Sequence, residues 1–199
     1  GDGKTWDIVG DKTDGALLLW ANEQNPDIET VKKTGRIRDE YTFDQQTKTI
    51  TTIWEYEKKA HVFVRGAPET ILQNCKLTPK EKEDIANTFE SYAKDGLRVI
   101  AVGARTEAEK ELTLLGIFGI YDPPRPEAKQ AVREAKQAGI RTIMVTGDNP
   151  LTALAIAKEV GLIEKDEDVL TGPELNAMTD EEVSRVLDRI RIFARTQPE

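Results

Sequence analysis

The chain has 199 residues, enough for one large domain or two small ones with a proper hydrophobic core. The net charge of −8 argues against a nucleic-acid-binding surface, which would show clustered Lys and Arg. The longest apolar run, 112–121, is about half the length that spans a bilayer, so we expect no membrane segment and no signal peptide in this chain. Cys75 is the only cysteine and His61 the only histidine, which excludes an internal disulfide and a zinc site of the usual ligands. We interpret His61 as a turn residue.

The first third of the chain predicts a strand, a helix and a loop. Residues 6–9 have the composition of a strand. Asp11 is a suitable N-cap for a helix through the apolar run 16–20, and Asp14 follows it as in a weak capping box. A helix-start role is therefore the simplest interpretation of Asp14. Residues 35–41 are polar and predict a loop.

Two strands separated by a short polar link predict a β-hairpin. The first, 49–56, is rich in Thr, Ile, Trp and Tyr, and the second is 62–64, with the link at 57–60. Further on, Thr-Pro-Lys-Glu at 78–81 is a strong helix start, and strands are expected at 98–104 and 112–121. We therefore expect residues 1–121 to form an α+β unit with a largely antiparallel sheet.

The stretch 62–69, Val-Phe-Val-Arg-Gly-Ala-Pro-Glu, is the first candidate site. The strand ends at Arg65, and Gly66 lets a ligand approach the main chain closely. Pro68 is well placed to begin a helix. A cation beside bare backbone suits an anion, although an ordinary strand-to-helix turn would have the same composition.

Asp-Pro-Pro-Arg-Pro at 122–126 is the clearest boundary in the chain, because three prolines in four positions make a stiff connector. After it, helices and short strands alternate, which predicts a parallel α/β layer. The expected elements are a helix at 126–138, a strand at 140–145, helices at 151–160 and 179–188, and a strand at 192–194.

Met144 to Pro150 is the second candidate site, at the carboxyl end of an expected parallel strand, where α/β sheets bind ligands. Thr146 offers a hydroxyl, Gly147 an open N–H and the following helix a positive end, which together suit a phosphoryl group. Asp148 could accept from a neighbouring loop or lie near a metal ion. The alternative is a capped strand-to-helix turn.

Taken in order, these segments resemble the cytoplasmic headpiece of the P-type cation-transporting ATPases. The resemblance spans nearly the whole chain. The residues of its motifs favour the calcium-pump-like branch of the family. The matching segments are Val9 to Leu17, Phe43 with Lys48, Arg65-Gly66-Ala67-Pro68-Glu69, Asp122 to Arg125, Thr146-Gly147-Asp148-Asn149 and Phe193 to Pro198.

The resemblance implies a nucleotide-binding domain over 1–121, followed over 122–199 by part of a Rossmann-like α/β phosphorylation domain of the haloacid-dehalogenase type. It implies ATP and Mg²⁺ as cofactors, and adenine stacked on Phe43 near Asp14. The implied ATP-binding residues are Asp14, Phe43, Gln45, Lys48, Arg65, Gly66 and Arg98. The implied phosphate and Mg²⁺ region comprises Thr146, Gly147, Asp148 and Arg195, and the implied hinge Asp122 and Arg125.

Two positions depart from the family pattern. Arg65 stands where the family signature has lysine, which keeps the charge but changes its reach and geometry. Gln45 stands where relatives often carry a basic or small polar residue, so its contact with the phosphates is expected to be weaker.

The family's nucleophile, the aspartate of an Asp-Lys-Thr-Gly-Thr motif, is not in this sequence, since the similar stretch at Asp11 continues as Asp-Lys-Thr-Asp-Gly. We therefore expect an ATP-binding, monomeric fragment of a cation pump that forms no aspartyl-phosphate and no metal site of its own. Its partners would be ATP and the other domains of the pump, at the cytoplasmic face of a membrane. A stand-alone phosphatase of the same superfamily and a non-catalytic nucleotide sensor remain the alternatives.

Overall fold

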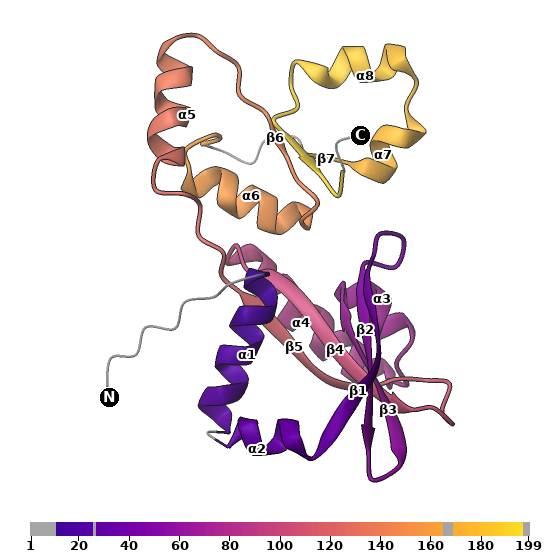
Figure 1. Cartoon of the computed structure of the whole chain (residues 1–199). Coiled ribbons are helices and arrows are strands. Elements are labelled where there is room, and N and C mark those ends of the chain that lie inside the picture. The colour runs from indigo at the N-terminus through magenta and orange to yellow at the C-terminus, as the bar shows by residue number, and fades with distance from the viewer. Residues whose placement is uncertain (1–10, 26, 165–168, 197–199) are drawn as a thin grey trace. The chain divides into compact units, whose positions relative to one another are not determined.

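The computed structural model describes residues 11–25, 27–164 and 169–196 (Figure 1). The strand expected at 6–9, the start of the segment at Val9 and the end of the one at Pro198 lie outside these residues. The chain forms two compact units, the first up to Thr78 together with Ile100–Ile120, the second from Pro79–Val99 together with Tyr121 onwards. Each is described by itself. The functional division expected at 121/122 stays a prediction.

The first unit is an α+β fold built on a five-stranded sheet, as expected. The strands follow one another across the sheet in chain order, and the pairs from the first to the fourth strand are antiparallel. The strands are β1 (Gly35–Asp44), β2 (Thr49–Tyr56), β3 (Lys59–Gly66), β4 (Arg98–Thr106) and β5 (Thr113–Ile120), and the helices α1 (Lys12–Gln24), α2 (Ile28–Lys33) and α3 (Pro68–Gln73).

The loop predicted at 35–41 is wrong, because these residues form most of β1. The strand lies at the edge of the sheet, and nearly all of its side chains are exposed. An edge strand needs no apolar alternation when its ladder to β2 supplies the pairing, which here runs from Gly35 opposite Tyr56 to Asp44 opposite Thr49. Composition alone therefore concealed the strand.

The predicted hairpin is confirmed, but its link is two residues long instead of four. Glu57 and Lys58 have φ values of 48° and 61°, as a two-residue turn that follows the twist of the strands requires. The strand β3 consequently begins at Lys59, and His61 lies within it opposite Trp54. The assignment of His61 to a turn is therefore wrong.

The core of the first unit forms where α3 and the following residues meet β4 and β5. Ile71, Cys75, Ala101 and Leu112 are buried there. Burial raises the pKa of the Cys75 thiol, so this cysteine stays protonated and packs as a small apolar side chain.

The second unit contains a three-stranded parallel sheet in the order β6-β8-β7, which confirms the expected parallel layer. Residues 121–125 carry no helix or strand, in agreement with the stiff connector. The elements are α4 (Pro79–Lys94), α5 (Ala128–Gln137), β6 (Met144–Val145), α6 (Pro150–Glu159), β7 (Val169–Thr171), α7 (Gly172–Ala177), α8 (Asp180–Leu187) and β8 (Ile192–Ala194).

The strand predicted at 140–145 is shorter than expected, since only Met144 and Val145 pair with β8. The residues before Met144 form no backbone ladder with β8. The side chain of Arg141 attaches them to the segment before β8 instead. The guanidinium of Arg141 donates to the carbonyl oxygens of Leu187 and Ile190.

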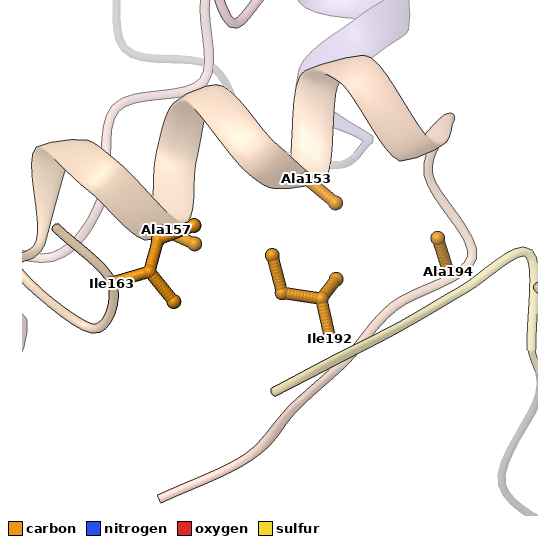
Figure 2. Packing of buried hydrophobic residues seen from close by; sticks show 5 residues of the cluster. All are labelled: Ala153, Ala157, Ile163, Ile192 and Ala194. Carbon is orange, nitrogen blue, oxygen red and sulfur yellow. The ribbon is translucent and has the colours of Figure 1, made fainter. Parts of the chain in front are cut away.

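The core of the second unit lies between α6 and β8 (Figure 2). Ala153 and Ala157 present small side chains from α6, and Ile192 of β8 points towards them, with no exposed surface. Alanine at the helix positions lets the strand approach closely, so that one isoleucine fills the space. This packing fixes the carboxyl end of the parallel strands, where the second candidate site lies.

Candidate functional site

One end of the five-stranded sheet gathers most of the predicted ATP-binding residues of the first unit. At this end β1 finishes at Asp44 opposite Thr49 of β2, and Thr49 lies opposite Gly66 of β3. The pairing therefore brings Phe43, from the end of β1, close to the end of β3. The residues gathered at this end are Phe43, Gln45, Lys48, Arg65 and Gly66.

The turn between β1 and β2 is ordered by Asp44. Its carboxylate accepts from the N–H groups of Gln46 (2.8 Å) and Thr47 (2.7 Å), and its carbonyl oxygen accepts from the N–H of Lys48 (2.7 Å). The hydrogen bonds from Thr47 hold the pKa of Asp44 below its usual value. Lys48 takes a left-handed conformation, with φ of 55°. The turn thus presents the exposed Gln45 and the Lys48 cation from a fixed backbone.

The same turn is attached to the Arg65 to Glu69 segment. The Lys48 carbonyl oxygen accepts from the N–H of Ala67 (3.1 Å), and the Thr70 hydroxyl donates to the carbonyl oxygen of Thr47 (2.9 Å). Gly66 is required at this crossing, because a Cβ there would lie 2.2 Å from the Lys48 carbonyl oxygen. The glycine of the motif therefore serves a close approach of two backbone segments.

Asp14 reaches this end of the sheet from α1. Its carboxylate forms an ion pair with the guanidinium of Arg65. Asp11 caps the helix as predicted, accepting from the N–H groups of Thr13 (2.8 Å) and Asp14 (3.1 Å). Asp14 thus has a contact beyond the helix start. Phe43 is 54% exposed, so its ring face is available to a ligand.

Asp11→Ala is expected to destabilise the first unit by about 1 kcal/mol at pH 7, the usual cost of losing an N-cap. The N–H of Asp14, bonded to the carboxylate, holds the pKa of Asp11 below its usual value. This stabilisation is present above the ordinary aspartate pKa of about 3.9 and is lost as the pH falls through the lower folded value. Urea unfolding between pH 7 and pH 3 measures it.

Asp11→Asn is the matched control, because asparagine caps as well but does not titrate. We expect near wild-type stability at pH 7 and a shallower loss in acid. Equal stability of Asp11→Ala and wild type at pH 7 would contradict the capping role.

The second candidate site lies at the carboxyl ends of β6 and β8, within the second unit. The Thr146 hydroxyl lies 3.2 Å from Oδ2 of Asp148, and the same hydroxyl accepts from the backbone N–H of Asp148 (3.1 Å). The carbonyl oxygens of Thr146 and Asp148 accept from the N–H groups of Thr196 (3.1 Å) and Arg195 (3.2 Å). Two segments nearly fifty residues apart in sequence, around Gly147 and Arg195, therefore lie side by side.

Arg98 belongs to this second group in the structure. Its Nε lies 3.2 Å from Oδ1 of Asp148, and the nearby Thr152 hydroxyl donates to the carbonyl oxygen of Leu97 (2.9 Å). Thr152 is buried, so this hydrogen bond holds Leu97 against α6 within the second unit. The role of Arg98 as an ATP-binding residue stays a prediction.

Sequence reasoning missed β7 and α7, which support Arg195. Arg195 has a φ of 55°, and a Cβ on Gly172 would lie 2.4 Å from its carbonyl oxygen. Thr171 and Glu174 form a capping box at the start of α7. The Thr-x-x-Glu spacing was the available signal.

The two predicted hinge residues lie in the connector before α5. Asp122 is half-buried, whereas Arg125 is exposed and its carbonyl oxygen accepts from the N–H of Ala128 (2.9 Å) at the start of α5. Their role as a hinge stays a prediction.

The described residues contain no group of three or more His, Cys, Asp or Glu side chains placed to hold a metal ion. Asp148 contributes a single carboxylate, already engaged by Arg98. These residues do not by themselves fit a resident Mg²⁺. Over the same part of the chain, no helix combines the length and the apolar character that crossing a bilayer requires.

Comparison with known proteins matches residues 1–127 to a family described as "P-type ATPase, cytoplasmic domain N". The chain is 36% identical to a calcium-transporting ATPase of Bacillus subtilis and 33% identical to calcium-transporting ATPase 1 of Lactococcus lactis. Each alignment covers 96% of this chain and 24% of the relative's length. Over 98% of the chain, identity is 35% to the sodium/potassium exporting P-type ATPase cta3 of Schizosaccharomyces pombe, covering 22% of that protein.

The chain belongs to the P-type ATPase family. The family match confirms the resemblance, and its description agrees with the expected cytoplasmic side. The chain spans about a quarter of the length of the curated relatives it matches.

Proposed function

We propose that this chain is the ATP-binding part of a cation-transporting ATPase. The observation that carries the proposal is the convergence, at one end of the five-stranded sheet, of an exposed aromatic ring, two cations and a glycine at which two backbone segments cross. These are Phe43, Lys48, Arg65 and Gly66. A base can stack on the ring, and the cations can neutralise phosphates.

In the second unit, we propose a phosphoryl-handling site and a fold of the haloacid-dehalogenase type. The parallel order of β6 and β8 supports this, because it brings Thr146, Asp148 and Arg195 to the carboxyl edge of the sheet. Arg98 beside Asp148 would supply a further cation for phosphate oxygens. Mg²⁺ would come bound to ATP, since the residues that the structure describes include no cluster of carboxylates placed to hold it.

We further propose that the chain alone forms no aspartyl-phosphate. Asp11 begins the stretch most similar to the family's nucleophile motif, but its Oδ1 accepts two helix N–H groups as an N-cap. The hydrogen bond from the Asp14 N–H lowers the pKa of Asp11, and a less basic carboxylate is a weaker nucleophile. Hydroxylamine-sensitive, acid-stable phosphate on the isolated chain after incubation with ATP would contradict this.

Phe43→Ala is expected to weaken ATP binding by about 1–3 kcal/mol, or 5- to 150-fold, the range for loss of an aromatic stacking partner. Stability should change little, since the ring is 54% exposed. Isothermal titration calorimetry measures the affinity, and thermal unfolding checks the fold.

Tyr41→Ala is the matched control for Phe43→Ala. Tyr41 is an equally exposed aromatic on the same strand, 59% exposed, but it pairs with Thr51 inside the ladder instead of lying at the strand end. Equal weakening by both variants would show that stacking on Phe43 is not what holds the nucleotide.

A further inference from the structure

A cavity of about 550 Å³ in the second unit has no part in the proposed function. It is lined by residues that precede the three parallel strands, among them Arg141, Leu162 and Arg191, so it lies at the amino end of this sheet. The proposed phosphoryl-handling residues lie at the opposite, carboxyl end. The volume of the cavity is within the range of pockets that hold small organic ligands.

Part of the cavity wall is apolar. Ile140, Leu162 and Ile163 line it. Ile163 is only 4% exposed and belongs to the core between α6 and β8 (Figure 2), so the packing of the unit holds this part of the wall in place. Ile140 is 63% exposed, and a ligand in the cavity would remove some of this apolar surface from water.

Three cations line the same cavity, and they differ in how far they are neutralised. Lys136 pairs with Glu164 (2.6 Å), which is also a lining residue. Arg141 pairs with Asp188 (3.3 Å) and donates to two backbone carbonyl oxygens. Arg191 is half-buried, and its guanidinium has neither a carboxylate partner nor a hydrogen-bond acceptor among the described residues. One positive charge at the cavity is therefore not compensated by the part of the chain that the structure describes.

These features together match one chemical class of ligand. A guanidinium is weakly hydrated, and its planar fork can donate two parallel N–H bonds to a carboxylate. Apolar walls strengthen such a pair, because they keep water and its screening away. The hydroxyl of Thr142, another lining residue, is a further potential donor. A single uncompensated cation suits one carboxylate group, whereas a polyphosphate would need several.

We propose that this cavity binds organic carboxylates that carry an apolar body. Arg191 holds the carboxylate, and Ile140 and Leu162 cover the apolar part of the ligand. The inference does not depend on the proposed ATP binding, since none of the residues proposed to bind ATP lines the cavity.

Hexanoate is a suitable probe, and amide resonances of the isotopically labelled 199-residue chain report where it binds. We expect saturable shifts concentrated in residues 139–142, 162–164 and 191–192, with an affinity in the millimolar range for so small a ligand. Hexan-1-ol has the same apolar body without the charge, and acetate has the charge without the body. Each should bind about tenfold more weakly than hexanoate, because each lacks one of the two interactions.

Arg191→Gln should weaken hexanoate binding about tenfold, the loss of a hydrogen bond to a charged group. Arg191→Lys keeps the charge and should retain most of the affinity. The matched control is Arg133→Gln, because Arg133 is an exposed arginine of α5 that does not line the cavity. It should leave the affinity unchanged, and thermal unfolding of all three variants checks the fold.

Three results would overturn the inference. The first is hexanoate that causes no saturable shifts, or shifts confined to other parts of the chain. The second is hexan-1-ol that binds as tightly as hexanoate, which would reduce the cavity to a nonspecific apolar surface. The third is a folded Arg191→Gln or Arg191→Lys variant whose affinity contradicts the expectation, with the glutamine variant unchanged or the lysine variant as weak as the glutamine variant.

Discussion

Gly66→Ala is expected to destabilise the first unit by about 3 kcal/mol or more, a large effect for a single methyl group. The added Cβ would lie 2.2 Å from the Lys48 carbonyl oxygen and 2.8 Å from the Thr49 Cα, which are both backbone atoms. Gly66 also has a φ of 154°, which side-chain-bearing residues rarely adopt. Relief would require moving the Lys48 turn off the end of β3.

Because the Ala67 N–H to Lys48 carbonyl hydrogen bond lies at this crossing, Gly66→Ala should also impair ATP binding. Amide hydrogen exchange of β2 and β3, compared with that of α6 in the second unit, localises the loss of stability. The control is Gly116→Ala, since a Cβ there meets only the Phe118 ring at ordinary contact distance, 3.5 Å. Equal stabilities of the Gly66 and Gly116 variants would contradict the account.

Ile192→Ala is expected to destabilise the second unit by about 2–5 kcal/mol, the range for truncating a buried isoleucine. Its side chain has no exposed surface and packs against Ala153 and Ala157 (Figure 2). Alanine would leave a cavity that the two small helix residues cannot fill. Urea unfolding, followed by hydrogen exchange of α6 and β8, measures the change.

Ile140→Ala is the matched control in the same unit, because Ile140 is 63% exposed and forms no part of β6. It should change the free energy of unfolding by less than about 0.5 kcal/mol. If both isoleucine variants unfold alike, the packing of α6 on β8 does not stabilise the second unit.

Local chemistry made much of this structure predictable. Asp11, Asn149 and Thr179 cap helices as their residue types predict, and the hairpin followed from β-branched and aromatic residues around a polar link. The order of the motifs predicted the family. Caps and hairpins depend on residues that are neighbours in the sequence, so the sequence alone is enough to predict them.

Features that depend on tertiary contacts were predicted less well. The polar edge strand β1 owes its conformation to pairing with β2, and the extent of β6 is set by its partner β8. The ion pair of Asp14 with Arg65 joins residues 51 positions apart, and no local sequence pattern predicts it. The same holds for Arg98 beside Asp148.

The central claim is that ATP binds at the end of the sheet formed by Phe43, Lys48, Arg65 and Gly66. Titrating the isotopically labelled chain with Mg²⁺-ATP, and following its amide resonances, tests this most directly. We predict saturable shifts concentrated in residues 43–48 and 65–70, with β1 and β2 unperturbed around Gly35 and Tyr56. The absence of saturable shifts, or shifts confined to other parts of the chain, would contradict the claim.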